Sequence, residues 1–140
     1  MIVVDASILA NALGDDEDDG DAARSALRAA GDLAAPDLVD VETVAVLRRR
    51  WLAWATSDER FDAAVADLQR WDFERVPTLR LVRRAYELRA NVAAYDAMYV
   101  ALAEALGCEL LTADQRLAGA TGPRCSIRAL SGRRGAAGNR

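Results

Sequence analysis

The chain has 140 residues, of which 18 are basic and 22 acidic, and it contains neither His nor Lys. This length suits one compact domain, and hydrophobic residues at 52% supply enough material for its core. The missing residue types exclude His-based triads, Lys Schiff bases, Walker A phosphate loops and zinc sites built from His. No apolar run is long enough to span a membrane and no signal peptide is evident, so we expect a cytoplasmic protein.

The net charge of −4 depends on one short segment. Residues 15–21 read DDEDDGD and contain six acids, whereas the rest of the chain is net positive. We interpret this segment as a solvated loop. An acidic total that arises from one loop does not exclude a nucleic-acid partner.

The first half of the chain predicts short apolar strands alternating with helices. Gly14 stops the first helix, Asp21 caps the second, and Pro36-Asp37 is a helix start. In chain order we expect a strand at residues 2–4, a helix at 6–13, a helix at 21–30, a brief apolar piece at 33–35 and a helix from 37 past 51.

The second half continues this alternation, which implies an α/β fold with a parallel sheet covered on both faces. In chain order we expect a helix from 57 or 58 to 70, a strand at 73–76, a helix at 78–89 capped by Thr78, a helix at 95–106, a strand at 109–112, a helical turn from 114 and a strand at 125–128. Residues 1–130 therefore form a single domain. Residues 131–140, SGRRGAAGNR, are rich in Gly and Arg and are expected to be a disordered tail.

Four acids lie in apolar surroundings. Asp5 directly follows the first strand, and Asp114 lies just past another strand. Glu42 shares a mostly apolar helix face, and Asp96 begins the most apolar helix of the chain. Each has an ordinary explanation as well: a helix N-cap for Asp5 and Asp114, dipole stabilisation for Asp96, and a side chain that reaches solvent for Glu42.

Taken together, these four acids fall at strand ends and helix starts, where a parallel sheet holds its ligands. Carboxylates that converge there repel one another unless a cation neutralises them. A site made of oxygen ligands suits Mg²⁺ or Mn²⁺. Ser7 and Thr112 could orient a carboxylate or a water, or they could make local turn and cap hydrogen bonds.

Four segments resemble the motifs of a known family, in the family's order and spacing. They are VVDAS (3–7), the Glu of DLVDVETV (37–44), YDAMYVALAEALG (95–107) and LLTADQRLA (110–118). The chain resembles the PIN-domain ribonucleases, specifically the VapC toxins of bacterial type II toxin–antitoxin modules. The resemblance implies a three-layer α/β/α sandwich with a five-stranded parallel sheet.

The implied function is a toxin that inhibits growth by cutting RNA with Mg²⁺ or Mn²⁺, through a metal-activated water. The family's acidic quartet corresponds to Asp5, Glu42, Asp96 and Asp114, and its two hydroxyls correspond to Ser7 and Thr112. We assign Asp5, Asp96 and Asp114 to metal binding, either directly or through water. We assign Glu42 to a second metal or to the orientation of the attacking water.

The resemblance also implies partners, namely an RNA substrate, a cognate VapB-type antitoxin and a second copy of the chain in a homodimer. Arg80, Arg83 and Arg84, like the Arg run at 48–50, could bind phosphates or could simply be solvated helix surface. The tryptophans, Trp51, Trp54 and Trp71, favour core packing, with an antitoxin or dimer groove as the alternative.

Two other functions remain open at this point. One is a PIN nuclease that processes RNA without an antitoxin, against which a short upstream gene for a partner would argue. The other is a catalytically inactive PIN-like binding module, which the intact quartet disfavours. Receiver domains and HAD-type phosphatases have similar sheets, but they need a Lys that this chain lacks.

Overall fold

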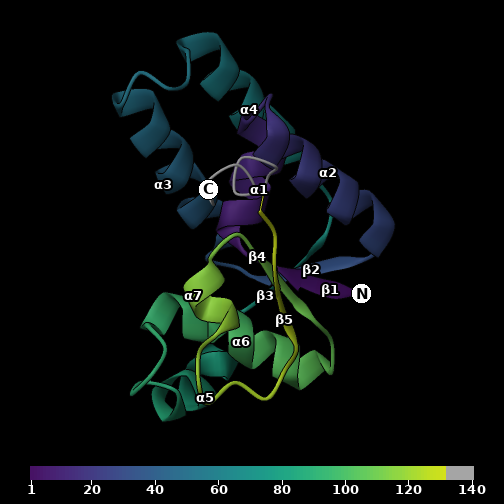
Figure 1. Ribbon diagram of the computed structural model, residues 1–140, viewed down its shortest axis with the longest axis vertical. Helices are drawn as coiled ribbons and strands as arrows, with labels where there is room; N and C mark the ends of the chain where they lie inside the picture. The colour runs from purple at the N-terminus through teal and green to yellow at the C-terminus, as the bar shows by residue number, and fades with distance from the viewer. Residues whose placement is uncertain (132–140) are drawn as a thin grey trace, which may run out of the picture.

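A five-stranded parallel sheet forms the centre of the computed structural model, which describes residues 1–131 (Figure 1). The strands are β1 (Ile2–Val4), β2 (Leu33–Pro36), β3 (Glu74–Val76), β4 (Leu110–Thr112) and β5 (Ile127–Ala129), in the order β3-β2-β1-β4-β5. The three central strands are buried along their whole length, as expected for strands covered on both faces. The predicted five-stranded parallel sheet is therefore confirmed.

Helices form a layer on each face of the sheet (Figure 1). One layer contains α1 (Ala6–Gly14), α2 (Asp18–Ala30), α3 (Val39–Leu52) and α4 (Asp58–Arg70). The other contains the 3-10 turn η1 (Thr78–Leu81), α5 (Val82–Glu87) and α6 (Ala94–Leu106), while α7 (Gln115–Ala118) contacts β4 and β5. This is the α/β/α sandwich that the resemblance implied.

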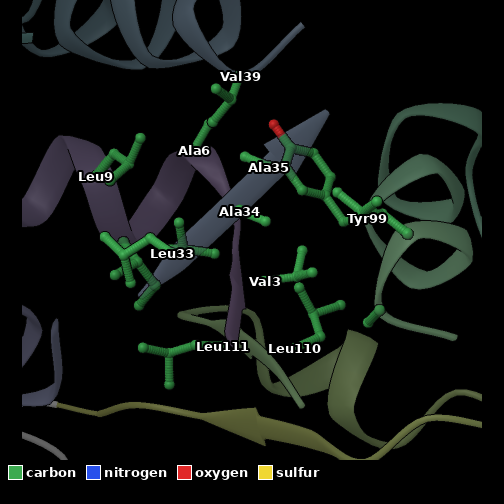
Figure 2. Close-up of a cluster of buried hydrophobic side chains, with 14 of the residues drawn as sticks. Val3, Ala6, Leu9, Leu33, Ala34, Ala35, Val39, Tyr99, Leu110 and Leu111 are labelled. Atoms are coloured by element: carbon green, nitrogen blue, oxygen red, sulfur yellow. The ribbon is translucent and has the colours of Figure 1, made fainter. Parts of the chain in front are cut away.

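The core lies where both layers meet the sheet (Figure 2). Val3 and Leu110 are register partners on neighbouring strands and are completely buried. Leu9 of α1 and Tyr99 of α6 are also buried, each from one of the two helix layers. Burying side chains of this size typically contributes about 1.5–3 kcal/mol each, which holds the central strands between the helices.

The strand order has a switch point beside β1, where sheets of this kind usually open a crevice. The chain moves from β1 to β2 on one side, whereas β4 flanks β1 on the other, so the order reverses between β1 and β4. Such a reversal opens a ligand-binding crevice at the carboxyl ends of the strands. Because Val4 pairs with Leu111, the residues that follow, Asp5 and Thr112, come together at this point.

The prediction that residues 15–21 form a solvated loop is wrong for 18–21, which are helical, although all the acids after Asp15 are exposed. The helix α2 already begins at Asp18, and three acids in its first turn interact favourably with the helix dipole. Arg24 donates hydrogen bonds to the carbonyl oxygens of Ala12 (3.0 Å) and Asp15 (2.8 Å). Arg24 thus ties α2 to the end of α1.

Replacing Gly20 by Ala is expected to destabilise the protein by about 1–3 kcal/mol, because a Cβ there would lie 1.8 Å from the carbonyl oxygen of Asp15. A helical Gly→Ala change normally stabilises by up to about 1 kcal/mol, so the sign is diagnostic. Urea unfolding measures the effect, with Gly119→Ala as a control, since a Cβ at Gly119 would make only an ordinary contact, 3.8 Å from the Arg116 carbonyl oxygen. A Gly20→Ala variant as stable as the parent would contradict the packing of α2.

Several other boundaries differ from the predicted ones. The helix predicted from residue 37 begins at Val39, and the last strand begins at Ile127 instead of residue 125. The helix predicted at 78–89 is a 3-10 turn followed by the short α5, and Thr78 does not cap it. The predicted tail lies outside the described residues, apart from Ser131.

Cys108 and Cys125 are both free and half-buried against the core. Within residues 1–131, no helix combines the length and the apolar character that a membrane crossing requires.

Candidate active site

Asp5 joins α1 to β4 through its two carboxylate oxygens, and its side chain is buried. Its Oδ1 accepts hydrogen bonds from the backbone N–H of Ser7 (3.1 Å) and Ile8 (3.3 Å) and from the Ser7 hydroxyl (2.5 Å). Its Oδ2 accepts a hydrogen bond from the hydroxyl of Thr112. Asp5 is therefore the N-cap of α1, as one interpretation held, and its carboxylate is oriented from both α1 and β4.

The hydroxyls of Ser7 and Thr112 each make two hydrogen bonds. Each donates its proton to Asp5 and accepts from the loop after β4, Ser7 from the N–H of Ala113 and Thr112 from the N–H of Asp114, both at 3.0 Å. The two hydroxyls thus fix the Asp114 backbone relative to Asp5. The exposed Asp114 carboxylate accepts a hydrogen bond from the N–H of Arg116 (2.9 Å) and caps α7.

Glu42 is half-buried on α3 and is held by α6. The Tyr99 hydroxyl donates a hydrogen bond to its Oε1 at 3.1 Å. In Figure 2 the Tyr99 ring extends from α6 toward the strand that contains Ala34 and Ala35. The sequence analysis did not identify Tyr99 as a residue of the site. The available signal was a hydroxyl in an otherwise aliphatic face, because a buried Tyr usually needs a hydrogen-bond partner.

Asp96 lies in the first turn of α6 and is half-buried. Within residues 1–131 its carboxylate makes no hydrogen bond and no ion pair. It does not cap the helix, whose N-cap is Ala93. Asp96 is therefore a partly desolvated carboxylate that no group of residues 1–131 neutralises.

The carboxylates influence one another electrostatically. Burial raises the pKa of Asp5, although its hydrogen bonds oppose this. Burial also raises the pKa of Glu42, and the charges of Asp96 and Asp5 raise it further. The pKa of Asp96 is raised by burial and by the charges of Asp5 and Asp114. Burial and the Glu42 charge raise the pKa of Tyr99, which keeps its hydroxyl protonated as a donor. The four acids thus form one cluster of excess negative charge.

A divalent cation fits this donor set. No Arg of residues 1–131 forms an ion pair with any of the four acids. No three Asp, Glu or Cys side chains in this part of the chain form a ready-made metal-binding group, so an ion would also need water or phosphate oxygens. Mg²⁺ is usually bound in that way, by one or two carboxylates together with waters and substrate phosphates.

The structure does not bring the predicted Arg group to the quartet. Arg84 pairs with Glu104 (2.8 Å), near the other end of α6 from Asp96, and with Glu87 (3.2 Å). With Arg80 it lines a cavity at the opposite edge of the sheet, where β4 and β5 begin. The guanidinium of Arg83 lies 5.8 Å from the ring of Tyr86. RNA binding by Arg80, Arg83 and Arg84 stays a prediction.

Comparison with known proteins places this geometry in a family. The model of the PIN domain matches residues 2–122. Ribonuclease VapC9 of Mycobacterium tuberculosis is 45% identical over 132 residues, which cover 91% of this chain and 96% of that protein.

Solved structures share the fold. VapC20 of M. tuberculosis, described as a sarcin-ricin loop cleaving toxin, has a TM-score of 0.61 at 22% identity and covers 99% of this chain and 95% of its own. VapBC2 of Rickettsia felis, solved with a DNA fragment from its promoter, has a TM-score of 0.65 at 14% identity, with coverage of 94% and 100%. The chain belongs to the PIN-domain family, among its VapC ribonucleases.

Proposed function

We propose that this protein is a metal-dependent endoribonuclease and the toxin of a type II toxin–antitoxin module. The observation that supports this most directly is the cluster of four carboxylates at the crevice between β1 and β4, with no Arg of the described residues paired to them. Such a cluster attracts a cation, and a cation there attracts a phosphodiester.

The roles of the acids follow from their surroundings. Asp5, Asp96 and Asp114 would hold Mg²⁺ or Mn²⁺, directly or through water. When bound, the ion supplies Lewis-acid chemistry that makes water more acidic and offsets charge on the phosphate. The hydrogen bonds to both oxygens of Asp5 keep this carboxylate from rotating, so that its geometry is preorganised.

Glu42 is the acid best placed to handle the proton of the attacking water. Its raised pKa makes it a better proton acceptor than an ordinary carboxylate, and Tyr99 holds one of its oxygens. The other oxygen, Oε2, has no hydrogen-bond partner in residues 1–131 and is available to a water.

The proposed partners are an RNA substrate, a VapB-type antitoxin and a second copy of the chain, all in the cytoplasm. The name of VapC9 and the VapBC2 assembly among the structural neighbours support the antitoxin. A single PIN domain over residues 1–130 is the proposed extent of the working unit.

Incubation of the purified protein with total RNA tests the function. We expect cleavage with Mg²⁺ or Mn²⁺, no cleavage with EDTA, and none with Asp5→Asn in any condition. Asp62→Asn is the matched control, since Asp62 is an exposed acid of α4 away from the crevice. Cleavage that survives EDTA would overturn the metal dependence, and no cleavage with either metal would leave an inactive binding module as the function.

A further inference from the structure

The turn between α3 and α4 exposes aromatic and basic side chains. We call residues 48–54, RRRWLAW, the hairpin tip. Core packing was predicted for all three tryptophans and holds for Trp71, which packs partly buried against the core. It is wrong for Trp54, whose side chain is 94% exposed, and for Trp51, which is 39% exposed. Figure 1 shows this turn at one end of the molecule, away from the sheet.

Trp54 has a backbone conformation that normally favours glycine. Its φ is 61°, and it is the one non-glycine residue with positive φ among residues 1–131. Its N–H donates to the carbonyl of Trp51 (3.0 Å), and the next N–H, of Ala55, donates to Arg50 (2.9 Å), which closes the end of α3. Glycine is the usual residue in such a turn, because bulky residues are strained there. Because the indole is exposed, its burial does not offset this backbone strain. The stability of the fold therefore does not explain why Trp occupies position 54.

The turn that presents Trp54 is held in place by its neighbour. The indole N–H of Trp51 donates to the carboxylate of Asp58 on α4 at 2.6 Å. The ring of Trp51 also packs against Phe61, with ring centroids 6.4 Å apart. Trp51 therefore connects α3 to α4, and these contacts hold the turn that carries Trp54 in place.

The hairpin tip also carries two exposed Arg side chains a few residues before Trp54. Arg48 and Arg49 are exposed, and within residues 1–131 their guanidinium groups make no ion pair and no hydrogen bond. Arg50 differs, since it donates to the Ala10 carbonyl and to the Asn11 side chain. The two free guanidinium groups are available to an anionic ligand.

The hairpin tip and the candidate active site are connected along one helix. Arg49 follows Glu42 by two helical turns, so both lie on the same side of α3, about 10 Å apart along its axis. Trp54 lies just beyond the end of the same helix. Along α3 the chain therefore passes from Glu42 of the quartet to the exposed Arg49 and, just beyond the helix, to the exposed Trp54.

We propose that the hairpin tip binds single-stranded RNA outside the active site, with Trp54 stacked on an unpaired base and Arg48 and Arg49 on phosphates. An RNA strand offers a flat base and an anionic backbone together, which matches the indole and the two guanidinium groups. Lying along α3, the strand would lead into the crevice that holds Glu42. The inference rests on the proposed function in one respect, that the bound strand is the substrate.

Trp54→Gly separates binding from folding. Glycine fits the positive φ, so we expect a variant at least as stable as the parent, measured by thermal unfolding. We expect its Kd for a labelled 12-nucleotide single-stranded RNA, measured by fluorescence anisotropy in EDTA, to rise at least about fivefold. Leu79→Ala is the control for loss of an exposed apolar side chain, since Leu79 is 83% exposed on η1, and its Kd should not change.

The Arg contribution is measured through salt. The double variant Arg48→Gln/Arg49→Gln should lower the slope of log Kd against log salt by about 1.4, because each phosphate contact on a single strand contributes about 0.7. Arg28→Gln, which removes an exposed Arg at the end of α2, should leave the slope unchanged.

An unchanged Kd for Trp54→Gly overturns the inference. An unchanged Kd together with a smaller species in sedimentation also overturns it and makes the tip an interface between copies. The proposed function is judged separately, by cleavage of total RNA. Metal-dependent cleavage by the parent together with normal RNA binding by Trp54→Gly would support the proposed function and contradict this inference. Weakened RNA binding by Trp54→Gly without any cleavage by the parent would support this inference and contradict the proposed function.

Discussion

Asp96→Asn is expected to lower the rate of RNA cleavage by at least about 100-fold and, at the same time, to stabilise the metal-free protein at pH 7. The loss of rate follows from removing a proposed ligand of the ion. The gain in stability follows because Asp96 is half-buried near Asp5 and Asp114 without a neutralising partner in residues 1–131. Relieving such a site typically stabilises by about 0.5–2 kcal/mol.

The raised pKa of Asp96 also predicts how the stability difference between the parent and Asp96→Asn changes with pH. The folded pKa of Asp96 lies above its unfolded value, so the folded state binds the proton more tightly. Well below the unfolded pKa of about 3.9 the carboxyl is protonated in both states and contributes no penalty. As the pH rises through the raised pKa, the metal-free parent loses stability relative to Asp96→Asn. The Asn side chain does not ionise, so the variant has no such pH dependence at this position.

Thermal unfolding in EDTA between pH 4 and pH 8 measures the difference between the parent and Asp96→Asn. The difference should be small at pH 4 and largest at neutral pH. Asp62→Asn, an exposed acid of α4, should show no comparable trend. An Asp96→Asn variant that is less stable than the parent at pH 7 would mean that this carboxylate has a stabilising role in the fold.

Thr112→Val is expected to reduce cleavage by about 10- to 100-fold and to destabilise the fold by about 1–3 kcal/mol. Valine keeps the shape of the fully buried side chain but removes a donor to Asp5 and an acceptor for the Asp114 N–H. Thr112→Ser keeps both hydrogen bonds and loses one methyl group, so it should cost about 1 kcal/mol and retain most of the activity.

The metal dependence of these variants separates positioning from general destabilisation. If Thr112 orients Asp5, the Mn²⁺ concentration for half-maximal cleavage should rise in Thr112→Val and stay near the parental value in Thr112→Ser. A lower melting temperature with an unchanged metal requirement would restrict Thr112 to a structural role.

The sequence was sufficient to predict the sheet and the location of two acids. Asp5 and Asp114 follow short apolar strands, and parallel strands end at the same edge, so their proximity could be expected. Short motifs also located Glu42 and Asp96. The strand order was not readable from local patterns, because it depends on which strands pair over long distances, such as Val4 with Leu111.

Features that depend on tertiary contacts could not be predicted. The early start of α2 rests on the approach of Gly20 to the Asp15 carbonyl, while the local acidic run favoured a loop. Arg84 looked available for phosphate, yet it is paired with Glu104, a residue distant in sequence. The link between Tyr99 and Glu42 joins two helices whose spacing no local pattern encodes.

The hydrogen bond between Asp5 and Thr112 has a consequence for synthesis of the chain. It joins residues 107 positions apart, so the N-terminal acid must wait for β4 before its carboxylate is fully oriented. A nascent chain on the ribosome therefore cannot complete the proposed active site until residues beyond Asp114 have emerged. We therefore expect the nascent chain to be inactive toward the messenger RNA that encodes it until β4 and Asp114 have been made.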